Sequence, residues 1–249
     1  VMAAIIIPTS IVAYSLLAWL FGMNLKVGWH SSIFGPFFVL TAVYSGVALL
    51  IFIMWLFRRT QKLEKTITNE HFMFLGYALV ILSLFYGYFY FSDYITDWYN
   101  MSNTYKILWS KLSDPNQYGL LMLTGIILTT GLPIIVIAFP WFRNINSIAI
   151  TSVFVLIGLW IMRYLMIVPI LETPFIPMQD VRPDWVHYSA TWIEWSLTAA
   201  GVALFILLFI FAAKIAPIVP VSELLEKKDA HKLMIFFRTR KKVSTQTTN

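Results

Sequence analysis

The sequence contains no cysteine, and this absence excludes several kinds of redox site. A chain without thiolates cannot bind an iron–sulfur cluster through cysteine, attach a c-type haem or form a disulfide. Any redox centre that works with this chain must therefore belong to a partner protein or be a bound small molecule.

Charged side chains are also scarce, at 12% of the 249 residues, whereas soluble domains carry about a quarter. Almost all of them fall between six apolar stretches. Each stretch is long enough to cross a hydrocarbon core about 30 Å thick as a helix that rises 1.5 Å per residue. The stretches cover residues 2–22, 31–57, 72–92, 118–140, 145–170 and 191–216.

Backbone groups in lipid have no water to bond, so a spanning segment must be a helix or part of a closed barrel, and the stretches lack the ten-residue alternation that is typical of barrel strands. The sequence therefore predicts an all-α, polytopic transmembrane bundle over residues 1–216, with six spanning helices. Residues 217–249 are predicted to form a cytoplasmic tail, helical at first and then basic. Because Val1 lies inside an apolar run, we expect further helices upstream in a longer protein.

The basic residues predict the orientation in the membrane. With a cytoplasmic N-terminal end, 13 of the 18 Lys and Arg fall in inner segments and four in outer ones. This bias predicts that both ends are cytoplasmic and that the loops 93–117 and 171–190 are on the outer side. The net charge of +6 fits a lipid surface better than nucleic acid, because the basic residues lie in loops and in the tail.

Arg163 is the main anomaly within the apolar stretches. It lies about seven residues inside the outer end of the fifth stretch, hence roughly 10 Å deep. An intramembrane arginine costs a few kcal/mol unless it is paired or reaches the interface. Two interpretations are open, a structural or interfacial arginine and an arginine that faces a pocket for an anionic or carbonyl-bearing ligand. Asp93 and Glu194 lie at a similar depth and are its natural partners.

His30 opens the second stretch on the same side, in the segment GWHSSIFGPFF. An isolated histidine there is more often an interfacial hydrogen bonder, but a neutral imidazole can also donate to a quinone carbonyl or accept a quinol proton. The aromatic end of the third stretch fits an interfacial belt or a flat cleft for a quinone ring. His30 and Asp93 are the candidate catalytic residues. The candidate residues for a quinone site or polar pocket are Trp29, His30, Tyr90, Asp93, Arg163 and Glu194.

Three other polar residues are candidates for a proton pathway, namely Tyr14, Glu70 and His71. For Tyr14, a hydrogen bond between helices is the structural alternative, and for the Glu70–His71 pair it is a solvated helix start. No metal site is predicted, because the four histidines are scattered and no two are spaced i, i+4. No P-loop, dinucleotide fingerprint or nucleophile elbow occurs either.

Four segments of the sequence resemble the NrfD-type family, the membrane subunits of polysulfide reductases, and in particular the large membrane subunits of bacterial alternative complex III. In the order of that family, the segments are GWHSSIFGPFFVLTAVYSG, YGYFYFSDYITDWYN, SVFVLIGLWIMRYLMIV and ATWIEWSLTAAGVALFILLFIFAAKIAPIVPVSELLE. The chain resembles the C-terminal part of such a subunit. It departs from the family at Tyr14, where relatives commonly have His, and at Met162, where an acidic residue often precedes the arginine. The segment MSNTYKILWSKLSDPNQYG also replaces a short loop.

The resemblance implies a subunit of a quinol oxidoreductase complex in the bacterial inner membrane, without catalytic activity on its own. It implies a non-covalently bound menaquinone or other quinone, whose oxidation is coupled to proton release. Electrons would pass to a periplasmic iron–sulfur subunit, and clusters and haems would lie only in partners, which include other membrane subunits and a multihaem cytochrome c. Lipids are expected partners and nucleic acid is not. The alternatives are a structural scaffold of the same kind of complex, or a proton channel or transporter.

Overall fold

The computed structural model divides the chain into two units by its contacts, Val1–Ser189 and Ala190–Asn249, and each unit is described by itself. His30 and the predicted tail 217–249 lie outside the described residues. The described residues are 2–24, 26–29, 31–61, 64, 67–99, 103–173, 188 and 190–215. These residues form helices joined by turns and contain no strand, which confirms the predicted all-α class.

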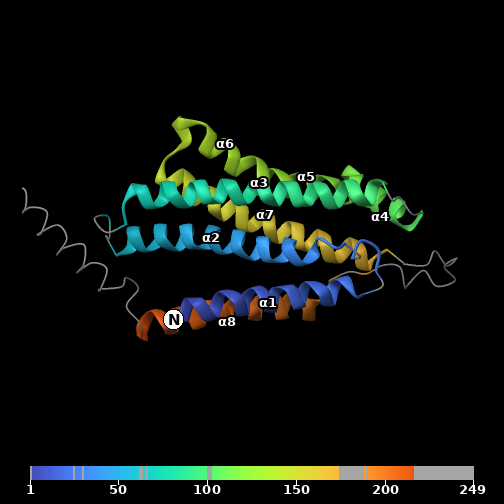
Figure 1. Cartoon of the computed structure of the whole chain (residues 1–249), viewed down its shortest axis with the longest axis horizontal. Coiled ribbons are helices and arrows are strands. Elements are labelled where there is room, and N and C mark those ends of the chain that lie inside the picture. The colour runs from blue at the N-terminus through green and yellow to red at the C-terminus, as the bar shows by residue number, and fades with distance from the viewer. Residues whose placement is uncertain are drawn as a thin grey trace, which may run out of the picture. The chain divides into compact units, whose positions relative to one another are not determined.

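Six helical segments in the described part of the chain are long and apolar enough to cross a membrane, which confirms the polytopic prediction (Figure 1). Each overlaps one of the six predicted stretches. The segments are α1 (Met2–Gly22), α2 (Phe34–Thr60), α3 (Asn69–Tyr99), the segment Pro115–Ala138, α7 (Ile145–Leu171) and α8 (Trp192–Ile215). The first five belong to the first unit and form what we call the bundle.

The expected loop 93–117 is mostly helical, which differs from the prediction. α3 continues to Tyr99, and α4 (Asn103–Ser113) follows it. The apolar residues of α4 recur at helical spacing on one face, which explains why this short polar segment is helical. They are Tyr105, Leu108, Trp109 and Leu112. α4 ends at Ser113, and the carboxylate of the next residue, Asp114, accepts a 2.9 Å hydrogen bond from the backbone N–H of Asn116.

The fourth spanning segment is not a uniform α-helix. It consists of a π-helix (Pro115–Gly119), α5 (Leu120–Ile126), a second π-helix (Ile127–Gly131) and α6 (Leu132–Ala138). Pro133 has no N–H, so it cannot donate to the carbonyl of Thr129 four residues earlier. The hydroxyl of Tyr44 donates to that carbonyl instead, at 2.6 Å. This bond between α2 and the second π-helix satisfies a backbone group that lipid could not.

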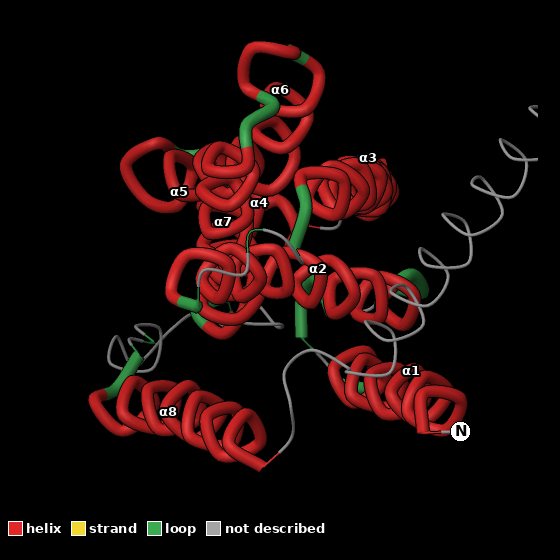
Figure 2. Tube along the Cα trace, turned by 90° about the vertical axis from the view of Figure 1, so that its left-hand side faces the viewer, coloured by secondary structure: helices red, strands yellow, loops and turns green. Residues whose placement is uncertain are grey.

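α7 lies at the centre of the bundle, surrounded by α2, α3, α5 and α6 (Figure 2). Two glycines allow the fourth segment to approach it closely. A Cβ on Gly158 would lie 2.8 Å from Leu128 Cβ, and a Cβ on Gly125 would lie 2.6 Å from Met162 Sδ. Small residues at such contacts are typical of helix interfaces in membranes. After α6, a short 3₁₀ turn (Pro140–Phe142) leads into α7.

Candidate functional site

A cavity of about 390 Å³ lies at the end of the bundle where α3 ends and α7 ends, and we call it the polar cavity. Its volume is in the range of small-molecule sites, roughly 300–1,000 Å³. Most of its lining is apolar. Its polar lining residues are Tyr14, Thr41, Ser45, Tyr86, Tyr90, Asp93, Tyr94, Asp97, Tyr105 and Arg163, together with the indole of Trp109 and that of Trp160.

α3 contributes one wall of the polar cavity through five residues, and four of them are spaced four, three and four apart, namely Tyr86, Tyr90, Asp93 and Asp97. Residues at these spacings lie on one face of a helix. Tyr86 is buried, and its ring stacks on that of Phe37 from α2, with centroids 5.3 Å apart. The face therefore runs from an aromatic floor inside the bundle to carboxylates near its end.

Arg163 enters the polar cavity from α7. Its Nη2 donates a 2.7 Å hydrogen bond to Thr41 Oγ1, and its Cζ lies 4.1 Å from the centroid of the Phe38 ring. A cation over an aromatic ring stabilises by about 2 kcal/mol or more where both are shielded from water. The bond to Thr41 uses one of the five N–H donors of a guanidinium. Arg163 thus faces the polar cavity, which Asp93 also lines, and its pairing with Asp93 stays a prediction.

Tyr105 of α4 brings a phenol to the two carboxylates of α3. The side chain is buried, with 8% of its surface exposed. Burial raises the pKa of Tyr105, and the charges of Asp97 and Asp93 and a side-chain hydrogen bond with Asp97 raise the pKa further. Tyr105 is therefore a neutral hydroxyl donor throughout the physiological pH range, next to two groups that can accept protons.

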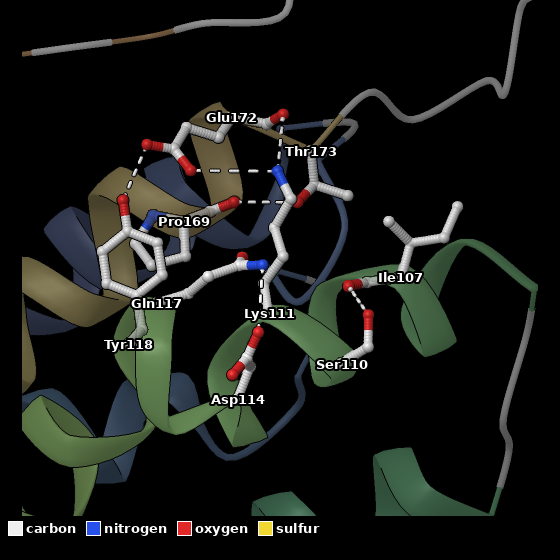
Figure 3. Close-up of polar contacts among 9 residues, drawn as sticks. All are labelled: Ile107, Ser110, Lys111, Asp114, Gln117, Tyr118, Pro169, Glu172 and Thr173. Carbon is white, nitrogen blue, oxygen red and sulfur yellow. Dashed lines mark hydrogen bonds and ion pairs between the residues drawn. The ribbon is translucent and has the colours of Figure 1, made fainter.

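A polar contact fixes α4 and the turn that follows it against the end of α7 (Figure 3). Lys111 Nζ lies 3.8 Å from Glu172 Oε2 and donates to the Glu172 backbone carbonyl at 3.4 Å. The hydroxyl of Tyr118 donates to Glu172 Oε1 at 2.7 Å. Glu172 thus contacts Lys111 before the π-helical turn and Tyr118 within it. These contacts keep the apolar face of α4 against one side of the polar cavity.

The loop before α2 covers another side. Gly28 lines the polar cavity with φ at 86°, a left-handed conformation that favours glycine. A Cβ there would lie 3.3 Å from both Leu108 Cδ2 and Ile170 Cδ1, so glycine also permits the close approach to α4 and α7. The adjacent Trp29 is buried, and its indole N–H donates a 3.0 Å hydrogen bond to the carbonyl of Met166.

The structure brings together four of the residues that the sequence predicted, since Tyr14, Tyr90, Asp93 and Arg163 all line the polar cavity. Trp29 is not among the lining residues, although it anchors the loop beside them. The role of His30 stays a prediction.

Two predicted residues lie elsewhere in the bundle, and a third belongs to the second unit. Glu70 and His71 are exposed at the start of α3, at the opposite end of the bundle from the polar cavity. There, the Nδ1 of His71 accepts a 3.2 Å hydrogen bond from the backbone N–H of Thr68. Glu194 belongs to the second unit, where its Oε2 accepts a 2.6 Å hydrogen bond from the N–H of Thr191 at the start of α8.

Sequence reasoning missed Thr41, Tyr86, Asp97 and Tyr105 as lining residues. The regular spacing of Tyr86, Tyr90, Asp93 and Asp97 could have indicated a shared face, had the third helix been extended beyond residue 92. A lone threonine in an apolar run carries no such signal. Tyr105 lay in an expected loop.

The chain is similar to known proteins over most of its length. Residues 1–174 match the family described as Polysulphide reductase, NrfD. One of the subunits of a selenate reductase from Mesobacillus selenatarsenatis is 22% identical to this chain over 221 residues, which is 85% of this chain and 50% of the relative. The chain thus spans about half the length of this curated relative. The family match contains every residue that lines the polar cavity.

Proposed function

This chain belongs to the polysulphide reductase, NrfD, family, and on that premise we propose that it is a membrane subunit of a quinol-oxidising reductase complex. We further propose that the polar cavity holds the quinone head group. The name of the curated relative, a selenate reductase subunit, supports the first part, because reduction of an acceptor requires a donor of electrons.

The observation that carries the proposal is the combination of groups in one largely apolar cavity. Arg163 and the tyrosine hydroxyls can donate hydrogen bonds to the two oxygens of a quinone, and two carboxylates lie on the same α3 face. Aromatic side chains such as Trp109 and Trp160 offer flat surfaces to its ring. Apolar pockets with a few convergent polar groups are typical of small-molecule sites.

Oxidation of a quinol breaks two O–H bonds and releases two protons and two electrons. In the proposed mechanism, Arg163 holds one oxygen of the ring by a charge-assisted hydrogen bond. Asp93 accepts the two protons one after the other, and Asp97 with its partner Tyr105 passes the first toward the end of the bundle before Asp93 takes the second. The electrons leave to an acceptor in a partner subunit, since a cysteine-free chain has no thiolate ligand for a cluster.

The finer assignment follows from the sequence. The resemblance to alternative complex III supports menaquinone as the quinone and supports a periplasmic iron–sulfur subunit, other membrane subunits and a multihaem cytochrome c as partners. The bias of Lys and Arg supports a periplasmic position of the polar cavity in the bacterial inner membrane, with a cytoplasmic C-terminal end. Proton release on quinol oxidation would then occur on the periplasmic side.

The test uses the assembled complex and a short-chain naphthoquinol. Asp93→Asn removes a proton acceptor, so we expect quinol oxidation to slow by roughly a hundredfold, in the range of general-base catalysis, and its pH dependence to change. Asp114→Asn is the matched control. It removes a carboxylate at the same end of the bundle but outside the cavity lining, and the amide oxygen can still accept the bond from Asn116.

The amount of each subunit in the purified complex separates loss of chemistry from loss of assembly. An Asp93→Asn/His30→Ala double variant that assembles and oxidises quinol at the normal rate would contradict the proposal and favour the scaffold. Proton flux through the isolated protein without quinol would favour the channel or transporter instead.

A further inference from the structure

A second, larger pocket lies at the other end of the bundle, where α2 ends and where α3 and α7 begin. Its volume is about 600 Å³, and we call it the arginine pocket. Three arginines line it, Arg58 and Arg59 from the last turn of α2 and Arg143 from the turn before α7. Among the described residues that line it, Glu64 is the one acidic residue, so positive charge is in excess.

The three guanidinium groups are held in position by the protein. Arg58 Nη1 donates to Asn69 Oδ1 at 3.2 Å, and Arg59 Cζ lies 5.4 Å from the Trp55 ring. Arg143 Nε donates a 2.7 Å hydrogen bond to the carbonyl of Ile137 at the end of α6. Each contact uses only part of a guanidinium, which has five N–H donors. The remaining donors are available to an anion in the pocket.

The first turn of α7 adds backbone donors to the same pocket. Asn144 is the N-cap residue, and its side chain makes no capping hydrogen bond. The Oδ1 of Asn146, in the same turn, accepts a 3.0 Å hydrogen bond from the Trp55 indole. The N–H groups at the start of an α-helix have no partner within the helix and carry partial positive charge, which favours anions.

We propose that the arginine pocket binds the phosphate of an anionic phospholipid. The pocket lies at the ends of three spanning helices, where a membrane interface must fall if these helices cross the bilayer. Trp141 and Phe142 immediately precede Arg143 and are exposed, as is typical of aromatic residues among lipid headgroups. Basic pockets between spanning helices bind anionic headgroups on the cytoplasmic side. The bias of basic residues predicts that same side.

A lipid in this pocket would contact three helices at once, because the pocket is lined by the end of α2 and by the starts of α3 and α7. Its phosphate would contact α2 and the start of α7, while its acyl chains would lie along the apolar outer surfaces of the helices. The site is independent of the proposed quinone chemistry, because it is on the opposite end of α3 from the polar cavity.

The test measures lipid retention and thermal stability of the full chain in detergent. We expect native mass spectrometry to show one retained phosphatidylglycerol, and this lipid to raise the melting temperature more than phosphatidylcholine does. Arg58→Gln/Arg59→Gln should weaken phosphatidylglycerol binding roughly thirtyfold, at about 1 kcal/mol per basic residue near a lipid surface. Lys106→Gln, an exposed residue on α4 at the other end of the bundle, should leave the affinity unchanged.

Three results would overturn the proposal. The first is equal affinity for phosphatidylglycerol and phosphatidylcholine, and the second is an equal loss of affinity in the Lys106 control. The third is stabilisation by inorganic phosphate alone, which would identify a site for a soluble anion. If the double variant does not fold, the single variant Arg59→Gln is used to measure the affinity for phosphatidylglycerol. This side chain is exposed, so its loss should lower the affinity about fivefold without unfolding the protein.

Discussion

Replacement of Arg163 tests the polar cavity most directly, because this residue connects the fold to the proposed chemistry. In the structure its guanidinium contacts Thr41 and the ring of Phe38, both on α2, and it faces the cavity from α7. Arg163→Gln keeps an amide that can donate to Thr41. It removes the positive charge and the planar donor pair that a quinone oxygen would use.

The expected magnitude follows from the bond that is lost. A hydrogen bond between a charged and a neutral group contributes about 1.5–3 kcal/mol. Its loss from the bound quinol should therefore lower kcat/KM by roughly 10- to 150-fold. Arg163→Lys keeps the charge but not the stacking on Phe38, so we expect a smaller loss. Thr41→Val removes only the group that orients the arginine, and about 1 kcal/mol, or roughly fivefold, is expected.

The assay is steady-state oxidation of a short-chain naphthoquinol by the assembled complex, with kcat and KM measured separately across pH. Thr124→Val is the matched control for Thr41→Val. The Thr124 hydroxyl is exposed on α5 and donates to Leu120 within its own helix. The Thr124→Val substitution should change neither kcat nor KM.

The result that would refute the reasoning is a change of less than about threefold for both Arg163 variants, set against the tenfold or more expected from the lost bond. The comparison is made only with variant complexes that retain all of their subunits. Arg163 would then serve to hold α7 against α2, and the cavity would not bind the head group. A thermal shift without a kinetic change would support the same structural role.

Three further predictions concern packing, the α4 contact and orientation. Gly158→Ala should lower stability by roughly 1–3 kcal/mol through overpacking, measured as a lower melting temperature, whereas Gly46→Ala, with open space around it, should not. Glu172→Gln should raise the KM for quinol while costing at most about 1 kcal/mol of stability, because its ion pair is partly exposed. Cysteines introduced at Lys106 and Lys241 should be labelled from opposite sides of the membrane, and labelling from one side would contradict the predicted topology.

The sequence predicted the spanning helices well because length and hydropathy suffice for that purpose. The prediction of helix bounds was wrong where a helix contains charged residues. The segment after residue 92 contains Asp93 and Asp97, so it appeared to be a loop, yet α3 continues to Tyr99. The carboxylates can lie on a helix there because one face of α3 lines a polar cavity rather than lipid.

The candidate site was predictable only in part, for a related reason. Arg163 stood out because an arginine is costly in an apolar stretch, and Asp93 stood out because of its depth. Thr41 could not be identified from its own segment, since its role depends on which face of α2 lies against α7. Tyr105 depended on a tertiary contact as well, because α4 reaches the cavity only when Lys111 and Tyr118 meet Glu172.

Carboxylates lie at one end of the bundle and arginines at the other. The two proposed sites therefore depend on the same orientation of the bundle in the membrane. Asn69 lies at the arginine pocket and Asp93 at the polar cavity, 24 residues apart on α3, hence roughly 36 Å by helical rise. That distance exceeds the thickness of a hydrocarbon core of about 30 Å. One site must therefore face each side of a membrane that α3 spans. If labelling put Lys106 on the cytoplasmic side, the polar cavity would release protons there and the arginine pocket would face the outer leaflet. That result would contradict both the proposed periplasmic position of the electron acceptor and the proposed cytoplasmic position of the lipid site. The proposed contact between Arg163 and the quinone head group does not depend on orientation, so the kinetics of the Arg163 variants would still test it.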